Sequence, residues 1–183
     1  MGMFIFKREL LVEAIKTSYS KGLVHLERDF LQKAHNDHGL KISVYEFDGV
    51  VLRNESISTY FKNNMALLDK DVRDGLFLPG ARIYTKVRDE FPTYYGAEST
   101  VDNCLLADGC IINGTIKNSV LFRDVNIEAD AIVKNSIIMQ GTKVGKGAQL
   151  ECVILDKDVT VTDGAVLKGT PSHPVIIKKG EEV

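Results

Sequence analysis

The sequence predicts a mainly β protein whose C-terminal part is a parallel β-helix, preceded by a smaller α+β segment. The first observation is a near-repeat, in which NSVLFRDVNI at residues 118–127 is followed by NSIIMQGTKV at residues 135–144. Related stretches begin at Asn103 and Glu151, so four copies follow one another at offsets of 15, 17 and about 17 residues. The second observation is that aliphatic residues recur at every fifth or sixth position within these copies. The third is an enrichment in Val, Ile and Thr, which strands prefer.

The spacing of the aliphatic residues distinguishes between fold classes. An amphipathic helix needs apolar residues three and four apart, and a β-hairpin needs strict alternation with a reversal. Steps near six, taken in threes, are typical of hexapeptide repeats, in which three short strands complete one triangular coil and each aliphatic residue stacks on its equivalent one coil away. A β-sandwich is the alternative, and the unbroken spacing disfavours it. The predicted inward residues are Val101, Leu106, Ile111, Ile116, Leu121, Ile127, Val133, Ile138, Val144, Leu150, Leu155, Val161 and Leu167.

Glycine, asparagine and aspartate cluster between the predicted strands. They tolerate the positive φ that a tight corner demands. They therefore mark the corners of the coils, at Gly109, Asn113-Gly114, Gly145, Gly147 and Asp163-Gly164.

The first part of the chain has a different pattern, with helical periodicity and few repeats. Residues 3–6 read as a strand, and the helix that follows is expected to end at Gly22. Residues 29–38 predict a second, shorter helix, and residues 41–53 predict a hairpin around Asp48-Gly49. Ser56 is placed to cap a third helix, with Ile57, Tyr60, Phe61, Met65 and Leu68 on its buried face.

These patterns predict three parts of the chain. Residues 1–76 form an α+β segment, residues 77–100 form a linker that carries Pro79-Gly80 and Pro92, and residues 101–183 form the β-helix.

Composition excludes several classes of protein. A net charge of −2 gives no strongly basic face, so we expect no nucleic-acid partner. No apolar run approaches the roughly 18–20 residues of a membrane span, and the N-terminus turns charged too early for a signal peptide, so we expect no membrane partner and a cytoplasmic location. The three cysteines, Cys104, Cys110 and Cys152, show no metal-site or disulfide spacing and are expected to be small buried residues.

The histidines do not support enzyme chemistry in the repeat. Many hexapeptide proteins use a histidine on a coil as a general base or as a zinc ligand. In this chain all four histidines lie outside the aliphatic repeat, and no nucleophile or carboxylate pair accompanies them. They are His25, His35, His38 and His173.

The order of four segments resembles the C-terminal portion of the glucose-1-phosphate adenylyltransferase (ADP-glucose pyrophosphorylase) family. The segments are MGMFIFKRELLVEAI at 1–15, DFLQK at 29–33, YEFDGVVLRNESISTYFKNNMALL at 45–68, and the hexapeptide region. The resemblance implies that the coil is left-handed and mediates subunit contacts and allosteric control. It also implies that residues 1–76 correspond to the sugar-binding end of a nucleotidyltransferase domain, without its nucleotide-binding half.

One position departs from the catalytic pattern of that family. Catalytic members hold Mg²⁺ with an aspartate that aligns with Arg53 of this chain. A guanidinium has no lone pair for a metal, so the resemblance implies no catalytic residue, no metal and no cofactor here; a simple surface ion pair of Arg53 with Asp48 or Glu55 is the alternative reading. The DFLQK segment keeps the family's aspartate as Asp29, a candidate for substrate binding, but places Leu31 where the family has glycine.

The resemblance therefore implies a regulatory, non-catalytic subunit of bacterial glycogen synthesis, inactive alone, that assembles with a catalytic adenylyltransferase subunit as a hetero- or homo-oligomer through the β-helix. Lys86 and Arg88 are candidate contacts for an anionic effector, against the alternative of exposed linker charges. Two other functions stay open at this point. One is a portion of an active enzyme that makes ADP-glucose from ATP and glucose 1-phosphate, and the other is a simple β-helix oligomerisation module.

Overall fold

The computed structural model describes residues 3–31, 35–36, 41–85 and 87–183. The chain divides into two compact units, Met1–Asp48 and Gly49–Val183, which are described separately below. In the described part, every helix is too short or too polar to cross a bilayer. The domain boundaries expected from the sequence stay a prediction.

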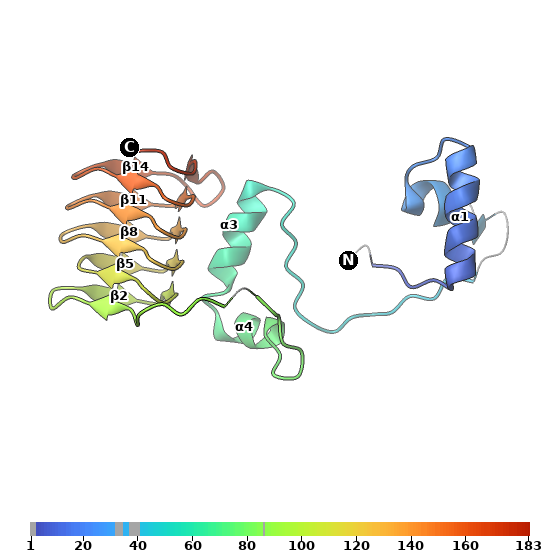
Figure 1. The fold of residues 1–183 in the computed structure, drawn as a ribbon, viewed down its shortest axis with the longest axis horizontal. Helices are drawn as coiled ribbons and strands as arrows, with labels where there is room; N and C mark the ends of the chain where they lie inside the picture. Colours follow the sequence, from blue (N-terminus) through green and yellow to red (C-terminus); the bar gives the residue numbers. More distant parts are fainter. Residues whose placement is uncertain (1–2, 32–34, 37–40, 86) are drawn as a thin grey trace. The chain divides into compact units, whose positions relative to one another are not determined.

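The second unit is dominated by a solenoid of three parallel sheets with five strands each, stacked coil upon coil (Figure 1). Sheet A contains β1 (Tyr94–Tyr95), β4 (Ile111–Ile112), β7 (Asn126–Ile127), β10 (Lys143–Val144) and β13 (Thr160–Val161). Sheet B contains β2 (Thr100–Asp102), β5 (Thr115–Lys117), β8 (Ile132–Lys134), β11 (Gln149–Glu151) and β14 (Val166–Lys168). Sheet C contains β3 (Leu105–Leu106), β6 (Val120–Leu121), β9 (Ile137–Ile138), β12 (Val153–Leu155) and β15 (Val175–Ile177). The predicted fold class, a left-handed β-helix of hexapeptide repeats, is confirmed.

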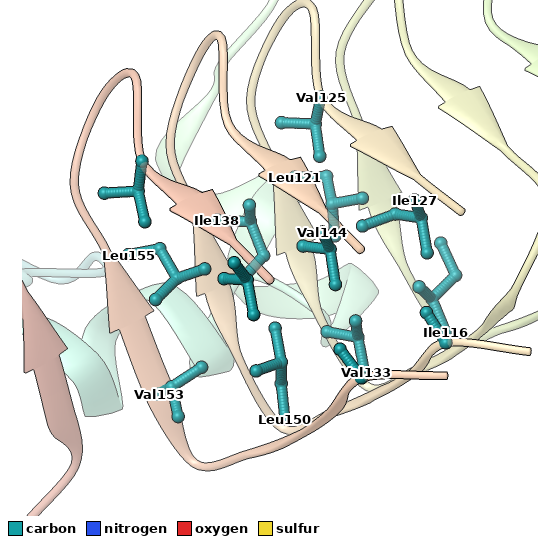
Figure 2. Close-up of a cluster of buried hydrophobic side chains, with 14 of the residues drawn as sticks. Ile116, Leu121, Val125, Ile127, Val133, Ile138, Val144, Leu150, Val153 and Leu155 are labelled. Atoms are coloured by element: carbon teal, nitrogen blue, oxygen red, sulfur yellow. The ribbon is translucent and has the colours of Figure 1, made fainter. Parts of the chain in front are cut away.

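Strand pairing follows the predicted repeat offsets. On sheet B each strand pairs with the next at a fixed register. Thr100 pairs with Thr115, Thr115 with Ile132, Ile132 with Gln149, and Gln149 with Val166, at offsets of 15, 17, 17 and 17 residues. The inward residues stack along the axis, as Figure 2 shows for Ile127 and Val144. A fully buried Val, Leu or Ile contributes about 1.5–3 kcal/mol, so three columns of such residues make a substantial core.

One predicted inward residue is wrong. Ile111 lies on the outer face of sheet A and is 44% exposed, whereas Ile112 is fully buried in the inward column with Ile127 and Val144. The error arises in the one shortened coil, where only four steps separate the inward Ile112 from Ile116. A regular step of five from Leu106 therefore matched the wrong member of the Ile111-Ile112 pair. Val101, Leu106 and Leu167 lie in inward columns but remain partly exposed, because they belong to the end coils.

The Asn-Ser repeat forms the corner between sheets B and C. Asn118 and Asn135 adopt φ values of 46° and 48°, the left-handed region that asparagine tolerates. The following serines are fully buried, and each hydroxyl donates to a backbone carbonyl two residues before it, Ser119 to Lys117 at 2.8 Å and Ser136 to Lys134 at 2.6 Å. The backbone N–H of Ser136 in turn donates to Ser119 Oγ at 3.1 Å, so the repeat links one coil to the next.

Replacing Asn135 by alanine should destabilise the solenoid by about 1 kcal/mol, because alanine disfavours the left-handed backbone conformation. Among the described residues, the Asn135 side chain forms no hydrogen bond, so the effect is conformational. Asn135→Gly is the matched control and should unfold at nearly the parent temperature. Equal melting temperatures for the alanine and glycine variants would contradict this explanation.

A helix covers the outer face of sheet C. The helix α3 (Ile57–Ala66) buries Phe61, which packs against Ile137, Cys152 and Ile154. Aliphatic pairs occur in sheet C because the first member faces this helix and the second faces the core, as in Ile137-Ile138. The face predicted for the third helix is confirmed at Phe61, whereas Ile57 is 54% exposed.

The ends of α3 are both held by side chains. The predicted cap at Ser56 is present, since its hydroxyl accepts from the N–H of Thr59 at 3.1 Å. At the other end, Arg73 of α4 (Lys70–Leu76) donates to the carbonyl oxygens of Leu67 and Leu68 at 2.7 and 2.8 Å. A cation at this end also complements the helix dipole.

The first unit contains α1 (Arg8–Ser20) and a short π-helix, η1 (Leu26–Leu31). Helix α1 ends at Ser20, just before the predicted stop at Gly22, whose φ is 67° and whose N–H donates to the carbonyl of Tyr19 at 3.0 Å. The strand predicted at residues 3–6 and the hairpin predicted at residues 41–53 are wrong, since these segments form no strand. An isolated pair of strands is marginally stable at best in water, and the described part of this unit has no sheet to join. The helix predicted at 29–38 begins earlier, at Leu26, and residues 32–34 and 37–40 lie outside the described residues.

Candidate functional site

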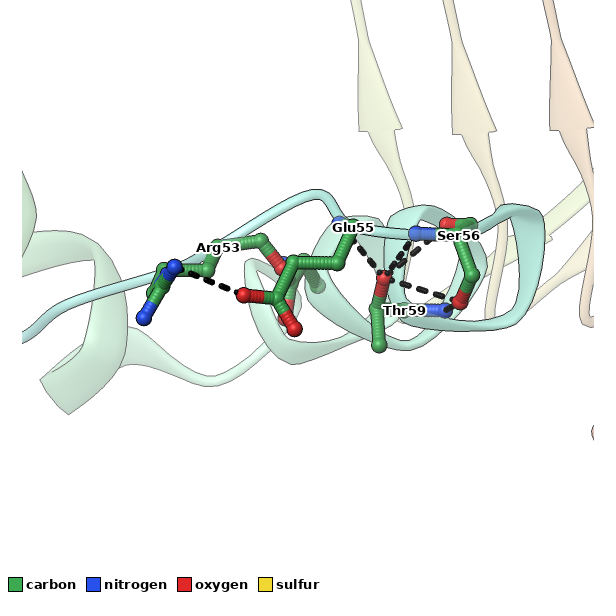
Figure 3. A network of polar contacts seen from close by, with 5 residues as sticks. Arg53, Glu55, Ser56 and Thr59 are labelled. Carbon is green, nitrogen blue, oxygen red and sulfur yellow. Dashed lines mark hydrogen bonds and ion pairs between the residues drawn. The ribbon is translucent and has the colours of Figure 1, made fainter. Parts of the chain in front are cut away.

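The candidate site is the segment that precedes α3 and contains Arg53. Its guanidinium lies 2.7 Å from a carboxylate oxygen of Glu55, and both side chains are more than 60% exposed (Figure 3). An exposed ion pair of this kind contributes at most about 1 kcal/mol to stability. The Arg53 guanidinium is therefore a solvent-exposed cation that contributes little to the stability of the fold.

Hydrogen bonds tie the Arg53 segment to α3. The side-chain amide of Asn63, within the helix, donates to the carbonyl oxygen of Arg53 at 2.9 Å and to Asn54 Oδ1 at 2.8 Å. The hydroxyl of Thr59 accepts from the backbone N–H groups of Glu55 and Ser56 at 3.0 and 2.9 Å, as Figure 3 shows. The helix therefore determines where the Arg53 segment lies.

The residues around Arg53 do not fit a Mg²⁺ ion. Hard cations take oxygen ligands, and a guanidinium offers only N–H donors. Glu55 supplies one carboxylate, and it is already paired with Arg53. Among the described residues, no three His, Cys, Asp or Glu side chains gather closely enough to hold a metal. That the chain needs no metal stays a prediction.

The second candidate residue, Asp29, lies in the first unit within η1. Its carboxylate accepts from the Arg28 side chain at 2.9 Å and from the backbone N–H of His25 at 3.0 Å. These hydrogen bonds, with that from Arg28 the stronger, lower the pKa of Asp29 to about 2. A hollow of about 460 Å³ lies in the same unit, lined by Phe4, Val24 and residues 25–28. Substrate binding by Asp29 stays a prediction.

The lowered pKa of Asp29 predicts a pH dependence for the first unit. Folding favours the ionised carboxylate, so this contact stabilises the unit fully above about pH 4 and is lost as the pH falls through the folded pKa of about 2. Carboxyl ¹³C NMR should show Asp29 titrating near 2 in the parent. In Arg28→Ala the pKa should rise toward the ordinary 3.8, whereas His25→Ala, which keeps the backbone N–H, should change it little. An Asp29 pKa unmoved by Arg28→Ala would contradict the contact.

The candidate effector residues are only partly described. Arg88 lies 3.7 Å from a carboxylate oxygen of Glu90, so its charge is partly balanced within the linker. Lys86 lies outside the described residues. Effector binding by Lys86 and Arg88 stays a prediction.

The cysteines behave as predicted for small apolar residues. All three are free thiols; Cys110 and Cys152 are buried, and Cys104 is half-buried. Burial raises the pKa of each thiol, which keeps it protonated and unreactive at neutral pH. Cys152 is unusual because it occupies, at a φ of 52°, the corner position that asparagine holds in the three preceding coils.

Sequence reasoning missed the contact between α3 and sheet C. The sequence does contain a signal for this contact, namely the pairs of adjacent aliphatic residues in the strands of sheet C. A strand with one solvent-exposed face alternates apolar and polar residues instead. Leu105-Leu106, Val120-Leu121 and Ile137-Ile138 all lack that alternation. A pair of this kind in each coil predicts that both faces of the sheet are covered.

Comparison with known proteins agrees with the fold. Residues 90–172 match the family described as GlmU-like, C-terminal hexapeptide. The glycogen biosynthesis protein GlgD of Bacillus subtilis (strain 168) is 37% identical over 179 residues, which cover 94% of this chain and 52% of the relative. GlgD of Geobacillus stearothermophilus is 44% identical over 118 residues, covering 64% of this chain and 34% of the relative.

A relative with a different name matches the same region. The glucose-1-phosphate adenylyltransferase of Bacillus mycoides (strain KBAB4) is 31% identical over 132 residues, covering 72% of this chain and 35% of the relative. The chain thus spans about a third to a half of the length of these relatives. The resemblance predicted from the sequence is confirmed, and this chain is related to the C-terminal portion of the glucose-1-phosphate adenylyltransferase family, including the proteins named GlgD.

Proposed function

We propose that the chain is part of a regulatory, non-catalytic subunit that acts in glycogen biosynthesis by assembling with a catalytic glucose-1-phosphate adenylyltransferase. The observation that carries the proposal is Arg53, a paired cation where the family resemblance places a metal-holding aspartate. The names of the relatives support the pathway, since they are a glycogen biosynthesis protein and an adenylyltransferase.

The outer face of sheet A supports assembly through the solenoid. Tyr94 and Ile111 pair across β1 and β4 on this face and are 60% and 44% exposed. Apolar side chains that lie side by side on an exposed face favour a protein partner. The strands β1, β2 and β3 also lie at the ends of their sheets, where free strand edges favour further pairing. We therefore assign the first two coils of sheet A as the contact surface for a catalytic subunit.

The test mixes this chain with a catalytic glucose-1-phosphate adenylyltransferase from the same source. Sedimentation velocity should show a species heavier than either protein alone. The full-length subunit that contains this chain should by itself make no ADP-glucose from ATP, Mg²⁺ and glucose 1-phosphate. Its presence should change the rate of the catalytic subunit, because a subunit that binds two states unequally shifts their balance.

Matched variants locate the contact. Ile111→Lys should abolish the heavier species, whereas Val166→Lys, which charges another exposed aliphatic residue on the outer face of sheet B, should leave it intact. ADP-glucose made by the full-length subunit without a catalytic partner would overturn the non-catalytic role. A mixture that sediments as two separate proteins would overturn the assembly.

A further inference from the structure

The contact between α3 and sheet C is small compared with the core beside it. In the helix only Phe61 is buried, at 3% exposure, and Tyr60 and Met65 are half-buried at the edge of the contact. The solenoid core, in contrast, is continuous over its coils, and every neighbouring pair of coils is joined by strand pairing. The helix is therefore held to the solenoid by few side chains.

A helix of ten residues is too short to be stable alone in water, so α3 depends on this contact. Elements with few buried contacts open with a lower free energy than the core to which they are attached. The three coils beneath α3 do not depend on the helix for their own strand pairing. These conditions favour opening of α3 on a solenoid that stays folded.

Cys152 reports on this contact. It is 4% exposed, and it lies in the same cluster as Phe61 and Ile154. The corresponding corner residues of the preceding coils, Asn118 and Asn135, are half-buried rather than covered. A cysteine therefore occupies this left-handed corner where an apolar helix covers it, and removal of the helix would expose its thiol.

The Arg53 segment moves with the helix. Asn63 holds the Arg53 carbonyl, and Thr59 holds the N–H groups of Glu55 and Ser56, so four residues before α3 are bonded to its first two turns. Opening of the helix therefore displaces Arg53 as well.

We propose that α3 is a strap that undocks from sheet C and redocks as a unit, and that it carries the Arg53 segment with it while the solenoid stays folded. The undocked state exposes an apolar strip made of Ile137, Cys152 and Ile154. A partner that binds only the docked or only the undocked state shifts the balance between them. The inference goes beyond the proposed function, because it requires neither a catalytic subunit nor a nucleotide.

The three cysteines allow a direct test by thiol labelling. Three single-cysteine chains are made, each with two of the replacements Cys104→Ser, Cys110→Val and Cys152→Asn. Each replacement is the residue found at the equivalent position of another coil, namely Ser119, Val125 and Asn135. Each labelling rate in native buffer is divided by the rate of the same thiol in denaturant, which removes differences in intrinsic reactivity.

The half-buried Cys104 should label fastest, Cys152 should be intermediate, and Cys110, which is 1% exposed inside the prism, should be slowest. Low urea should accelerate Cys110 far more than Cys152, because local opening exposes less surface than global unfolding. Phe61→Ala should raise the Cys152 rate by at least about tenfold and leave the Cys110 rate unchanged.

Two further variants keep the test decisive. Ser56→Ala removes the cap of α3 and should raise the Cys152 rate by about fivefold even if Phe61→Ala proves too disruptive. Lys62→Ala removes an exposed side chain of the same helix and should change nothing. Equal rates and equal urea dependence for Cys152 and Cys110 would overturn the strap, because α3 would then open only with the solenoid. A Cys152 rate equal to that of Cys104 in the parent would overturn it as well, because the helix would not be docked.

Discussion

Val144→Asp should abolish the cooperative thermal unfolding of the solenoid. Val144 is fully buried in the inward column between Ile127 and Val161. A carboxylate at this position has only aliphatic neighbours, and burying it without a partner costs about 4 kcal/mol or more. This is a large part of the 5–15 kcal/mol that typically stabilises a domain. Far-ultraviolet circular dichroism during heating should show a gradual change in place of a transition.

The adjacent residue provides the matched control for this substitution. Lys143 is exposed on the outer face of the same strand, and its cross-strand neighbours are the neutral Asn126 and Thr160. Lys143→Asp introduces the same side chain one residue away and should melt within about 2 °C of the parent, because substitutions at exposed positions rarely change stability by more than 0.5 kcal/mol. If Val144→Asp melted like Lys143→Asp, the inward assignment of Val144 would be wrong.

Gly114→Ala should destabilise the shortened coil by about 2–3 kcal/mol, through overpacking. A Cβ built at Gly114 would lie 2.5 Å from the carbonyl oxygen of Ala131 and 2.8 Å from that of Glu128. These are backbone atoms of the next coil, so they cannot move aside without disturbing its strand pairing. Thermal unfolding should therefore occur about 4–12 °C below the parent.

Gly80→Ala is the matched control, because a Cβ at Gly80 would meet no atom within 4 Å. Its melting temperature should stay within about 2 °C of the parent. A Gly114→Ala variant as stable as Gly80→Ala would contradict this explanation, because it would show that neighbouring coils can move apart at this corner to make room for a Cβ.

The shortened coil explains both the 15-residue offset and the need for glycine at this corner. The other coils use six residues to pass from sheet A to sheet B, as from Ile127 to Val133, whereas this coil uses four, from Ile112 to Ile116. Fewer residues bring the corner closer to its neighbour, and Gly114 lies in the column that alanine occupies at Ala131 and Ala148. The absence of a Cβ allows the approach.

The fold of the solenoid follows closely from the sequence, because each inward position repeats its environment in every coil. Ile127, Val144 and Val161 are related by 17 residues, and the strands pair with that register. The error at Ile111 has a physical cause, since Ile111 fits a regular step of five on both sides, and only the shortened corner before Ile116 makes Ile112 the inward residue. The predicted strand and hairpin of the first unit failed because a strand pattern needs a sheet to join.

The sequence singled out Arg53 as the residue of interest, but it did not predict which residues contact the Arg53 segment. The position of Arg53 came from the family resemblance, and its ion pair with Glu55 was one of the readings considered from the sequence. The hydrogen bonds from Asn63 to the Arg53 carbonyl and to Asn54 cross ten and nine residues, respectively, and local propensity carries no information about them. The same holds for the packing of Phe61 on Cys152, which joins residues 91 positions apart.

By itself, the sequence determined the repeat and the inward columns, because these depend on the type and spacing of residues along one chain. That Arg53 stands where the family holds a metal with a carboxylate comes from the resemblance and stays a prediction. Only the tertiary structure decided which isoleucine of a pair faces inward, why a cysteine takes the place of asparagine at one corner, and how the Arg53 segment is bound to the solenoid through α3. The physical reason is that these features depend on the close approach of segments distant in sequence. Several side-chain arrangements can fit the same local sequence pattern, and packing and backbone sterics decide which of them the folded protein adopts.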